Sequence, residues 1–467
     1  MADDALHNLT ITEAAARLEA GSLSPVALTE AVLSRMEATE PALNAYVTRM
    51  TEGAREDARA AEARARAGKR LGPLDGIPVA VKDLYDTADV VTTGGTGAYR
   101  YRVPSEDAAA VALLRRAGAV ITGKTNTHEL AFGGTTNNMH YGATHNPWDL
   151  QRVPGGSSGG SGAALAVGSA LGALGTDTGG SIRIPAAFCG VTGHKPTYGL
   201  VSRAGIIPLS HTLDHAGPMA RTAHDCALML NALQGYDERD LDSVERPAED
   251  FTAALHGDVR GLRLAVIPSL SWNTTPAVHA NFEASLDTLR SLGVEVTRAE
   301  PMAGEEDWRN HILNIMRVEA YDYAEHLMSR SVSQIGAPVR SRIEPGGTVP
   351  AWVYARELDA RKRIERAFER CLREERLDGY VLPTSPITAF GIDPDPTRDQ
   401  APPVIFQNTT IFDLTHQPSI SVPNGFDAED LPTGLMVTTG LWQDALALRI
   451  GHAFQQATDF HTRRPPL

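Results

Sequence analysis

The sequence is poor in cysteine, and the few cysteines exclude two classes of protein. Only three of the 467 residues are cysteines: Cys189, Cys226 and Cys371. They lack the close spacing of metal-binding cysteines and the density of a disulfide-stabilised domain. We therefore expect a reducing compartment, the cytoplasm, with the cysteines as apolar side chains of the core. The acidic first residues, 1–6, carry no feature of a secretory signal, which supports the same location.

Positive charge is also scarce. There are 43 Lys and Arg residues against 57 Asp and Glu residues, which gives a formal net charge of -14. This balance opposes a general attraction to nucleic acid or to an anionic membrane surface. We therefore expect neither as a partner.

Long runs of large apolar side chains are absent as well. Residues 153–176 carry no charge and are numerous enough to span a bilayer. Glycine, serine and alanine dominate this stretch, however, so it lacks the bulky side chains of a transmembrane helix. We interpret it as a glycine-rich segment of a globular protein.

Apolar spacing predicts helices and strands that alternate along the chain. The predicted helices cover residues 11–21, 26–38, 107–117, 278–289, 353–376 and 444–458. The predicted strands cover residues 77–81, 119–122, 264–267, 294–296, 381–383, 420–422 and 434–437, with a loop at 123–126. Such alternation is typical of an α/β fold.

One motif suggests nucleotide binding. Residues 118–125 match the phosphate-binding pattern G-x-x-x-x-G-K-[ST]. That pattern requires a strand before its first glycine and a helix after its last residue. Here a predicted helix precedes it and its middle is strand-like, so phosphate binding is not indicated. Lys124 is then expected to be a surface lysine.

A second motif suggests an α/β-hydrolase. Residues 155–159 match G-x-S-x-G, which would make Ser157 a nucleophile with a distant histidine as its base. The preceding residues, 152–154, are a poor approach strand, and no histidine stands out as a partner. This alternative is therefore less favoured than the next one.

The third pattern joins Lys82, Ser157 and Ser181. Lys82 follows an apolar predicted strand, where loss of solvent would lower its pKa and let the neutral amine act as a base. Such an amine can activate a serine directly or through another hydroxyl. Ser181 lies in a glycine-lined turn before a helix-like segment, where free N–H groups can stabilise a negative oxygen. The pattern indicates a serine hydrolase without a catalytic histidine.

These motifs resemble those of the amidase signature family over nearly the whole chain. The matching stretches are residues 72–83, 123–133, 146–148, 153–162, 175–190, 195–197, 213–214, 217–218, 383–384, 418–423 and the final helix. The resemblance implies that Ser181 is the nucleophile and Lys82 the base. It implies that Ser157 relays the proton and follows a cis peptide bond with Gly156.

The resemblance also implies the surroundings of the nucleophile. The implied oxyanion hole consists of the backbone N–H groups of Thr178, Gly179, Gly180 and Ser181. The implied substrate-binding residues are Phe132, Gly133, Gly134 and Ile182. Asp177 and Arg183 are expected to form a buried pair that holds the Ser181 loop.

The fold implied by the resemblance is α/β, with a large mixed central β-sheet covered by α-helices on both faces. It would form a single domain over residues 1–467. The N-terminal helices would take up about 10–65, the catalytic core about 66–230, and the pocket-shaping and C-terminal part about 231–467. The resemblance also suggests a homodimer, and it implies neither a metal nor a cofactor.

Three functions are consistent with the resemblance. The first is hydrolysis of a small-molecule amide through a seryl acyl-enzyme, which releases an acid and ammonia or an amine. The second is the A subunit of a glutamyl-tRNA amidotransferase, a glutaminase within a ligase complex. Residues 193–199 and 202–203 fit that subfamily, whereas residues 412–418 depart from it, and Arg361 is expected to be a solvated arginine on a charged helix. The third is hydrolysis of a carbamate (a urethanase), a urea derivative or an arylamide.

Overall fold

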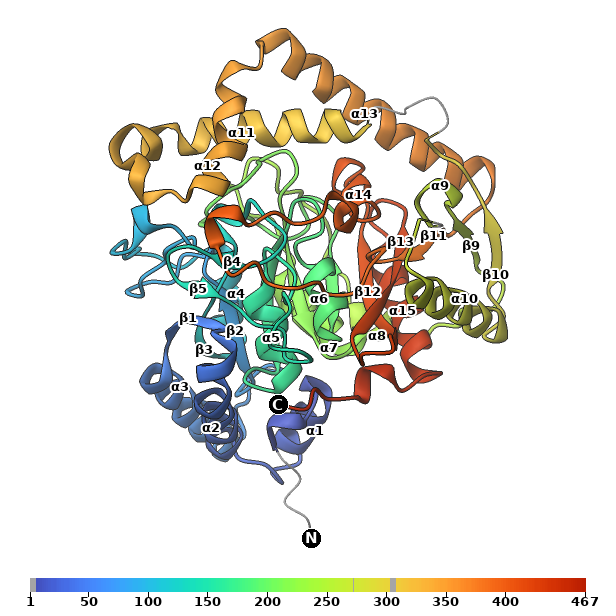
Figure 1. The fold of residues 1–467 in the computed structure, drawn as a ribbon. Coiled ribbons are helices and arrows are strands. Elements are labelled where there is room, and N and C mark those ends of the chain that lie inside the picture. Colours follow the sequence, from blue (N-terminus) through green and yellow to red (C-terminus); the bar gives the residue numbers. More distant parts are fainter. Residues whose placement is uncertain (1–5, 272, 303–307) are drawn as a thin grey trace.

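A computed structural model describes residues 6–271, 273–302 and 308–467. Residues 1–5, on which the expectation about a secretory signal rests, lie outside the described residues. The described chain is built around an 11-stranded sheet with the order β1-β3-β2-β6-β8-β7-β12-β13-β11-β9-β10 (Figure 1). Its strands are β1 (Tyr46–Arg49), β2 (Pro78–Lys82), β3 (Val120–Thr125), β6 (Gly172–Asp177), β7 (Thr192–Lys195), β8 (His215–Ala220), β9 (Arg263–Val266), β10 (Glu295–Arg298), β11 (Gly379–Pro383), β12 (Ser419–Phe426) and β13 (Pro432–Thr439). A separate pair consists of β4 (Asn137–Asn138) and β5 (Gly142–Ala143).

The helices confirm the predicted α/β alternation. They are α1 (Ile11–Glu19), α2 (Pro25–Leu43), α3 (Thr51–Arg66), α4 (Ala109–Arg116), α5 (Gly159–Val167), α6 (Arg183–Cys189), α7 (Ala223–Leu233), α8 (Phe251–Ala254), α9 (Pro268–Ser271), α10 (Pro276–Ser291), α11 (Trp308–Ser331), α12 (Ala337–Ile343), α13 (Ala351–Glu374), α14 (Ile411–Leu414) and α15 (Asp444–Gln456). The 3-10 helices are Leu6–Asn8, Gly97–Tyr99, Glu129–Ala131, Val332–Gln334, Glu344–Thr348, Pro396–Arg398, Pro403–Phe406 and Phe460–Thr462. The N-terminal helices begin where the sequence predicts. Thr10 forms a capping box with Glu13 at α1, and Ser24 caps α2.

The sheet is mixed and covered on both faces, as predicted. β2 is parallel to β3 and β6, whereas β6 pairs antiparallel with β8. Within β2, Val79 and Val81 pack into one hydrophobic cluster and Ala80 into another. Since alternate strand residues point to opposite faces, each face of the sheet has its own core.

Two predictions about residues 118–125 meet different outcomes. β3 takes up residues 120–125, so the motif contains a strand where a phosphate-binding loop would be, which confirms its rejection. The predicted loop at 123–126 is wrong for the first three of its residues, which belong to the strand. The surface position of Lys124 is also wrong: its side chain is fully buried, with Nζ 3.1 Å from Asp83 Oδ1. Lys124 Nζ also donates to the Tyr85 carbonyl at 2.8 Å and to Thr92 Oγ1 at 2.7 Å, so the segment that follows β2 covers this side chain.

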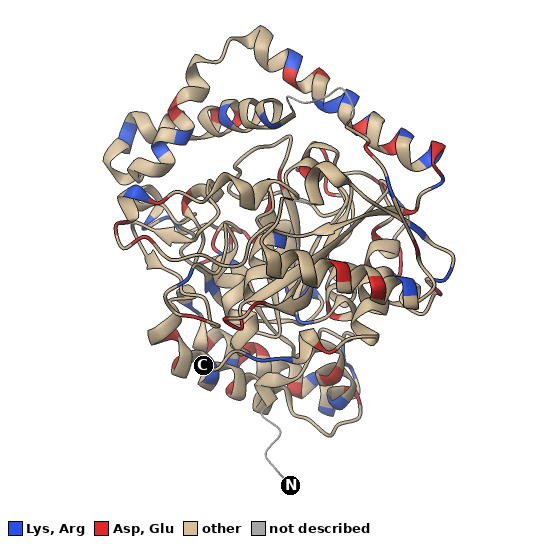
Figure 2. Cartoon of the chain, turned by 45° about the vertical axis from the view of Figure 1, so that its right-hand side comes forward, with Lys and Arg blue, Asp and Glu red and all other residues tan. Residues whose placement is uncertain are grey.

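α11, α12 and α13 form a layer beyond one end of the sheet, at the top of Figure 1. Basic and acidic residues are interspersed along these helices in Figure 2. Glu319 on α11 accepts a hydrogen bond from the Thr212 N–H of the body below at 3.0 Å and one from the Tyr354 hydroxyl of α13 at 2.7 Å, so it joins α11 to both. Apolar spacing did not predict α11, although this helix forms one wall of the site described next.

None of the described helices combines the length and apolar character that a membrane span requires.

Candidate active site

Lys82 is the last residue of β2, and it meets Ser157 in the interior. The Lys82 side chain is fully buried. Its Nζ donates hydrogen bonds to Ser157 Oγ at 2.8 Å and to Thr176 Oγ1 at 2.7 Å. The Gly156–Ser157 peptide bond is cis, as expected from the resemblance. Thr176 was missed by the sequence analysis, because only the pairing of β2 with β6 brings it beside Lys82.

The surroundings of Lys82 favour its neutral form. Burial lowers its pKa to about 7, although the negative charges of Asp177 and Asp214 oppose this shift. An amine with a pKa near neutrality can accept a proton from a hydroxyl and return it within one catalytic cycle. The lowered pKa agrees with the prediction that Lys82 acts as a base.

Ser181 lies in the turn between β6 and α6, next to the Ser157 segment. The Ser158 N–H donates to the Ser181 carbonyl oxygen at 3.2 Å. The Ser157 carbonyl accepts hydrogen bonds from the Thr127 hydroxyl at 2.9 Å and the His128 N–H at 3.1 Å. The two glycine-lined turns are therefore held against each other, as the Ser-Ser-Lys pattern requires.

The Ser181 turn is fixed by the predicted buried pair of Asp177 and Arg183. The Asp177 carboxylate accepts from the Gly180 N–H at 2.5 Å, from the Ile182 N–H at 3.0 Å and from Arg183 Nε at 3.0 Å. Both ionic side chains are fully buried. Burial alone would raise the pKa of Asp177, but the Arg183 guanidinium holds it well below its usual range. The carboxylate therefore stays ionised and orders the turn.

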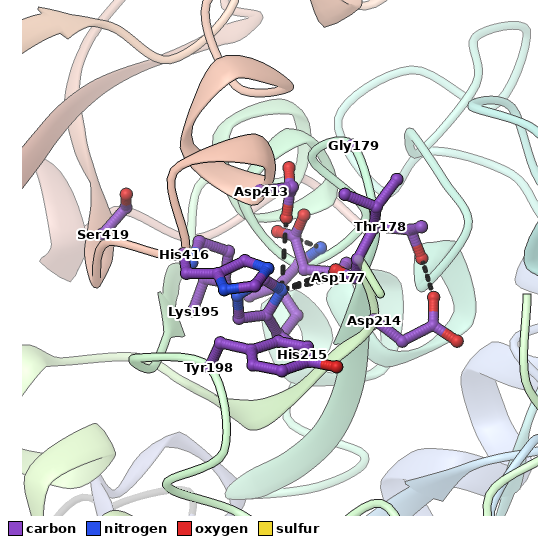
Figure 3. A network of polar contacts seen from close by, with 12 residues as sticks. Asp177, Thr178, Gly179, Lys195, Tyr198, Asp214, His215, Asp413, His416 and Ser419 are labelled. Carbon is purple, nitrogen blue, oxygen red and sulfur yellow. Dashed lines mark hydrogen bonds and ion pairs between the residues drawn. The ribbon is translucent and has the colours of Figure 1, made fainter. Parts of the chain in front are cut away.

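A second carboxylate, Asp413, shares the Arg183 guanidinium. Arg183 Nη2 lies 2.7 Å from Asp413 Oδ2, and His215 Nδ1 lies 3.5 Å from Asp413 Oδ1 (Figure 3). Burial raises the pKa of Asp413 well above its ordinary value, and the charge of Asp177 adds to this shift. Lys195 lies in the same network, and burial lowers its pKa to about 7. Asp413, Lys195 and His215 could not be recognised in the sequence as partners of the Asp177–Arg183 pair, since they come from α14, β7 and β8.

The backbone donors of the turn are not equivalent. The Gly180 N–H is taken by Asp177, and the Gly179 carbonyl accepts from the hydroxyls of Thr409 at 2.7 Å and Thr410 at 2.9 Å. The peptide unit between Gly179 and Gly180 is thus hydrogen-bonded through both its carbonyl oxygen and its N–H group. Within residues 178–181, the backbone N–H groups that have no acceptor among the described residues are those of Thr178, Gly179 and Ser181.

Ser181 opens onto a cavity of about 520 Å³. Of the implied substrate-binding residues, Phe132, Gly133 and Gly134 line this cavity. Ile182 does not: its side chain is fully buried in the core, and a Cβ on Gly193 would lie 2.7 Å from its Cγ2. The expectation for Ile182 is wrong, because the side chain that follows Ser181 points toward the sheet. The other lining residues are Ala131, Thr178, Gly179, Leu209, Trp308, Arg309, Ile312, Leu313, Met316, Arg317, Arg342, Gln400, Ala401, Pro403, Phe406, Gln407 and Thr410.

The sequence model of the Amidase family matches residues 27–448. The chain belongs to the amidase family. It is therefore an enzyme that acts on carbon–nitrogen bonds.

Several relatives of this amidase match it from end to end. The A subunit of the glutamyl-tRNA(Gln) amidotransferase of Roseiflexus sp. (strain RS-1) is 40% identical and is covered over 99% of each chain. The solved structure of 6-aminohexanoate cyclic dimer hydrolase in complex with substrate has a TM-score of 0.90 at 26% identity, with 98% of this chain and 99% of that chain covered. The native peptide amidase of Stenotrophomonas maltophilia has a TM-score of 0.84 at 30% identity, with 98% of each chain covered.

Two further observations on this amidase complete the description of the site. Arg361 on α13 is not solvated as predicted: its side chain is largely buried, and Nη1 donates to Glu365 at 2.7 Å and to the Leu414 carbonyl at 3.1 Å. Arg361 thus ties α13 to α14 and does not line the cavity at Ser181.

Across residues 6–271, 273–302 and 308–467, no three His, Cys, Asp or Glu side chains are grouped so that they could hold a metal ion.

Proposed function

We propose that this amidase hydrolyses an amide bond through an acyl-enzyme on Ser181. Ser181 attacks the carbonyl carbon while Ser157 passes the proton on to neutral Lys82. The protonated Lys82 then returns a proton to the leaving nitrogen, and water activated by the same relay releases the acid. The observation that carries this proposal is the 2.8 Å contact between the buried Lys82 amine and Ser157 Oγ.

The proposed oxyanion hole differs in one member from the set implied by the resemblance. The N–H groups of Thr178, Gly179 and Ser181 are free to receive the negative oxygen, whereas that of Gly180 is engaged with Asp177. We assign Gly180 to holding the turn, with the other three as donors. A single such donor typically lowers the barrier by about 3 kcal/mol.

The relatives bear on whether the chain carries out this chemistry together with partner subunits or alone. The 40% identity over the full length of an amidotransferase A subunit supports a glutaminase that works with partner subunits. The likeness to two hydrolases of known structure supports a stand-alone amidase. The identity to the amidotransferase chain is the higher, so we place that setting first. The stand-alone amidase comes second, and a carbamate, urea-derivative or arylamide hydrolase third.

Labelling with a fluorophosphonate probe tests the nucleophile. Wild-type protein should be labelled at Ser181, as located by mass spectrometry of the digested protein, and Ser181→Ala should not be labelled. Labelling at Ser157 in both proteins would support the α/β-hydrolase alternative, in which Ser157 of the G-x-S-x-G motif is the nucleophile, and would contradict the proposed relay.

Ammonia release from glutamine distinguishes the settings. The purified chain should be assayed alone and after co-expression with amidotransferase partner subunits, with Ser181→Ala as the background. Release only in the presence of partners supports the amidotransferase setting. Turnover of a panel of amides, anilides and carbamates by the isolated chain supports a stand-alone enzyme. The mass of the isolated chain in solution tests the suggested homodimer.

A further inference from the structure

Asp214 is a buried carboxylate that the proposed relay does not use. It directly precedes β8, and its Oδ1 accepts a hydrogen bond from the Thr178 hydroxyl at 2.6 Å (Figure 3). Its Oδ2 accepts from the N–H groups of Leu209 at 2.8 Å and Ser210 at 3.1 Å. Burial raises the pKa of Asp214, and these three hydrogen bonds oppose the shift because they favour the ionised form. No Lys, Arg or His side chain among the described residues forms an ion pair with this carboxylate.

Thr176 connects Asp214 to Lys82. The Thr176 hydroxyl accepts a hydrogen bond from Lys82 Nζ at 2.7 Å. Thr176 and Asp214 also line the same cavity of about 260 Å³, whose lining shares no residue with the cavity at Ser181. Asp214 therefore lies behind the amine, on the side away from the proposed substrate site.

Proton transfer in the proposed relay leaves a positive charge on Lys82. The amine is fully buried, and a buried ammonium requires a negative charge nearby. Two carboxylates raise the pKa of Lys82 against the effect of burial, those of Asp177 and Asp214. The charge of Asp177 is balanced by Arg183, whose Nη2 lies 2.9 Å from it. Asp214 has no such partner, so its charge is the one that remains for Lys82.

The other ionisable side chains around Lys82 and Asp214 fall into two groups. Those in ion pairs are Asp83 with Lys124, Arg203 with Asp240 and Asp242, Arg239 with Asp237, and His211 with Glu319. Those that burial keeps uncharged, by raising the pKa of a tyrosine or lowering the pKa of a histidine, are Tyr85, His128 and His215. Neither group supplies an unpaired negative charge to Lys82.

We propose that Asp214 is the counter-charge of protonated Lys82 and that it also positions Thr178 in the oxyanion hole. Its charge stabilises the ammonium that forms as Ser181 attacks. Its hydrogen bond to the Thr178 hydroxyl orients a residue whose N–H is one of the proposed oxyanion donors. One carboxylate thus acts on both charges that develop during the attack. The inference rests on the proposed function, and Asp214 is a positioning residue that takes no part in bond breaking.

The protonation of Lys82 tests the charge of Asp214 without catalysis. In Ser181→Ala protein labelled with ¹³C at the lysine Cε atoms, an NMR titration gives the pKa of each amine, and Lys82→Met assigns the signal. The lysines to be resolved are Lys69, Lys82, Lys124, Lys195 and Lys362. Asp214→Asn should lower the pKa of Lys82 by about half a unit or more, because the amide can keep the hydrogen bonds but loses the charge. An unchanged pKa of Lys82 would overturn the inference.

Two controls belong to this titration. The pKa of Lys195 should stay the same in Asp214→Asn, because Asp413 and Asp177 are the carboxylates nearest in effect to that amine, and an unchanged Lys195 signal also shows that the variant is folded. Asp242→Asn removes a carboxylate from the wall of the same cavity and should leave the pKa of Lys82 unchanged. An equal shift in Asp242→Asn would contradict a specific role of Asp214.

Turnover tests both parts of the inference. Asp214→Asn should move the fall of kcat/KM at acidic pH to lower pH by the same amount as the pKa of Lys82. Thr178→Val keeps the charge of Asp214 but removes the hydroxyl that it holds. This variant should leave the pH dependence in place and lower kcat about tenfold or more with little change in KM, whereas Thr178→Ser should keep most of kcat.

The outcomes separate this inference from the proposed function. Amide hydrolysis with an unshifted pH dependence in Asp214→Asn refutes the counter-charge, and an unchanged kcat in Thr178→Val refutes the positioning of Thr178. Both results leave the proposed function supported. A pKa of Lys82 that depends on Asp214, in a protein that hydrolyses no amide, refutes the proposed function and supports the counter-charge.

Discussion

The amine of Lys82 and the hydroxyl of Ser157 lie 2.8 Å apart in the protein interior, with the hydroxyl as acceptor. Thr176 accepts a second hydrogen bond from the same amine at 2.7 Å. These two contacts fix the direction of the amine, and burial keeps it close to its neutral form.

Activity should follow the protonation of Lys82. The proposed base is the neutral amine, whose pKa is lowered to about 7, so it would be protonated and inactive below that pH. We expect kcat/KM to fall about tenfold per pH unit below about pH 7 and to level off above it. Lys82→Ala should remove most activity and recover part of it at high pH, where hydroxide substitutes for the base. pH–rate profiles of the two proteins check this.

Lys195 provides the control for that profile, because burial lowers its pKa to about 7 as well. Lys195→Met should keep the same acid limb. If the fall of kcat/KM at acidic pH disappears in Lys195→Met and persists in Lys82→Ala, the assigned base is wrong.

The two serines should differ in the size of their effects. Ser181→Ala removes the nucleophile and should lower kcat by about 10⁴-fold or more. Ser157→Ala removes the relay but leaves the nucleophile, so we expect a smaller loss of about 10²- to 10⁴-fold. Ser341→Ala, an exposed serine on α12, is the matched control. Single-turnover kinetics on an activated amide measure all three, and a larger loss for Ser157→Ala than for Ser181→Ala would reverse the assignment.

The adjacent glycines of the turn should respond differently to alanine. Gly180 has φ +128°, and a Cβ there would lie 2.7 Å from Ile184 Cδ1 and 2.9 Å from Thr409 Cβ. At Gly179 the nearest atom to a Cβ is Thr410 Oγ1 at 3.3 Å, and the backbone is not in the left-handed region. We therefore expect Gly180→Ala to abolish probe labelling of Ser181 and Gly179→Ala to keep most of it. The rate of fluorophosphonate labelling checks this, and equal rates in the two variants would contradict it.

The two buried carboxylates beside Arg183 should contribute unequally to stability. Asp177 is held ionised and accepts from three backbone N–H groups, so Asp177→Asn should lower the free energy of unfolding by about 3 kcal/mol or more. Asp413 has a raised pKa, and a neutral side chain suits its position better, so Asp413→Asn should cost about 1 kcal/mol. Urea unfolding at pH 7 measures both values. A larger loss for Asp413→Asn would show that Asp413 carries the buried charge.

Much of the fold could be predicted because its signals are local. The first two helices begin within one residue of their predicted starts, and the apolar run before Lys82 forms β2. Lys124 could not be placed in this way. Its burial depends on Asp83, Tyr85 and Thr92, which lie in a separate part of the chain and surround its amine only after folding.

The chemical groups of the candidate site can be recognised from the sequence alone. Lys82 at a strand end, and Ser157 and Ser181 in glycine-lined turns, are marked by residues directly next to them. The side chains and the cavity wall that surround these groups depend on the tertiary structure. It places Thr176 beside Lys82 and turns Ile182 into the core. It also brings α11 over the cavity. The physical reason is that a turn or strand end follows from neighbouring residues, whereas burial, charge pairing and a cavity wall depend on segments that meet only when the chain folds.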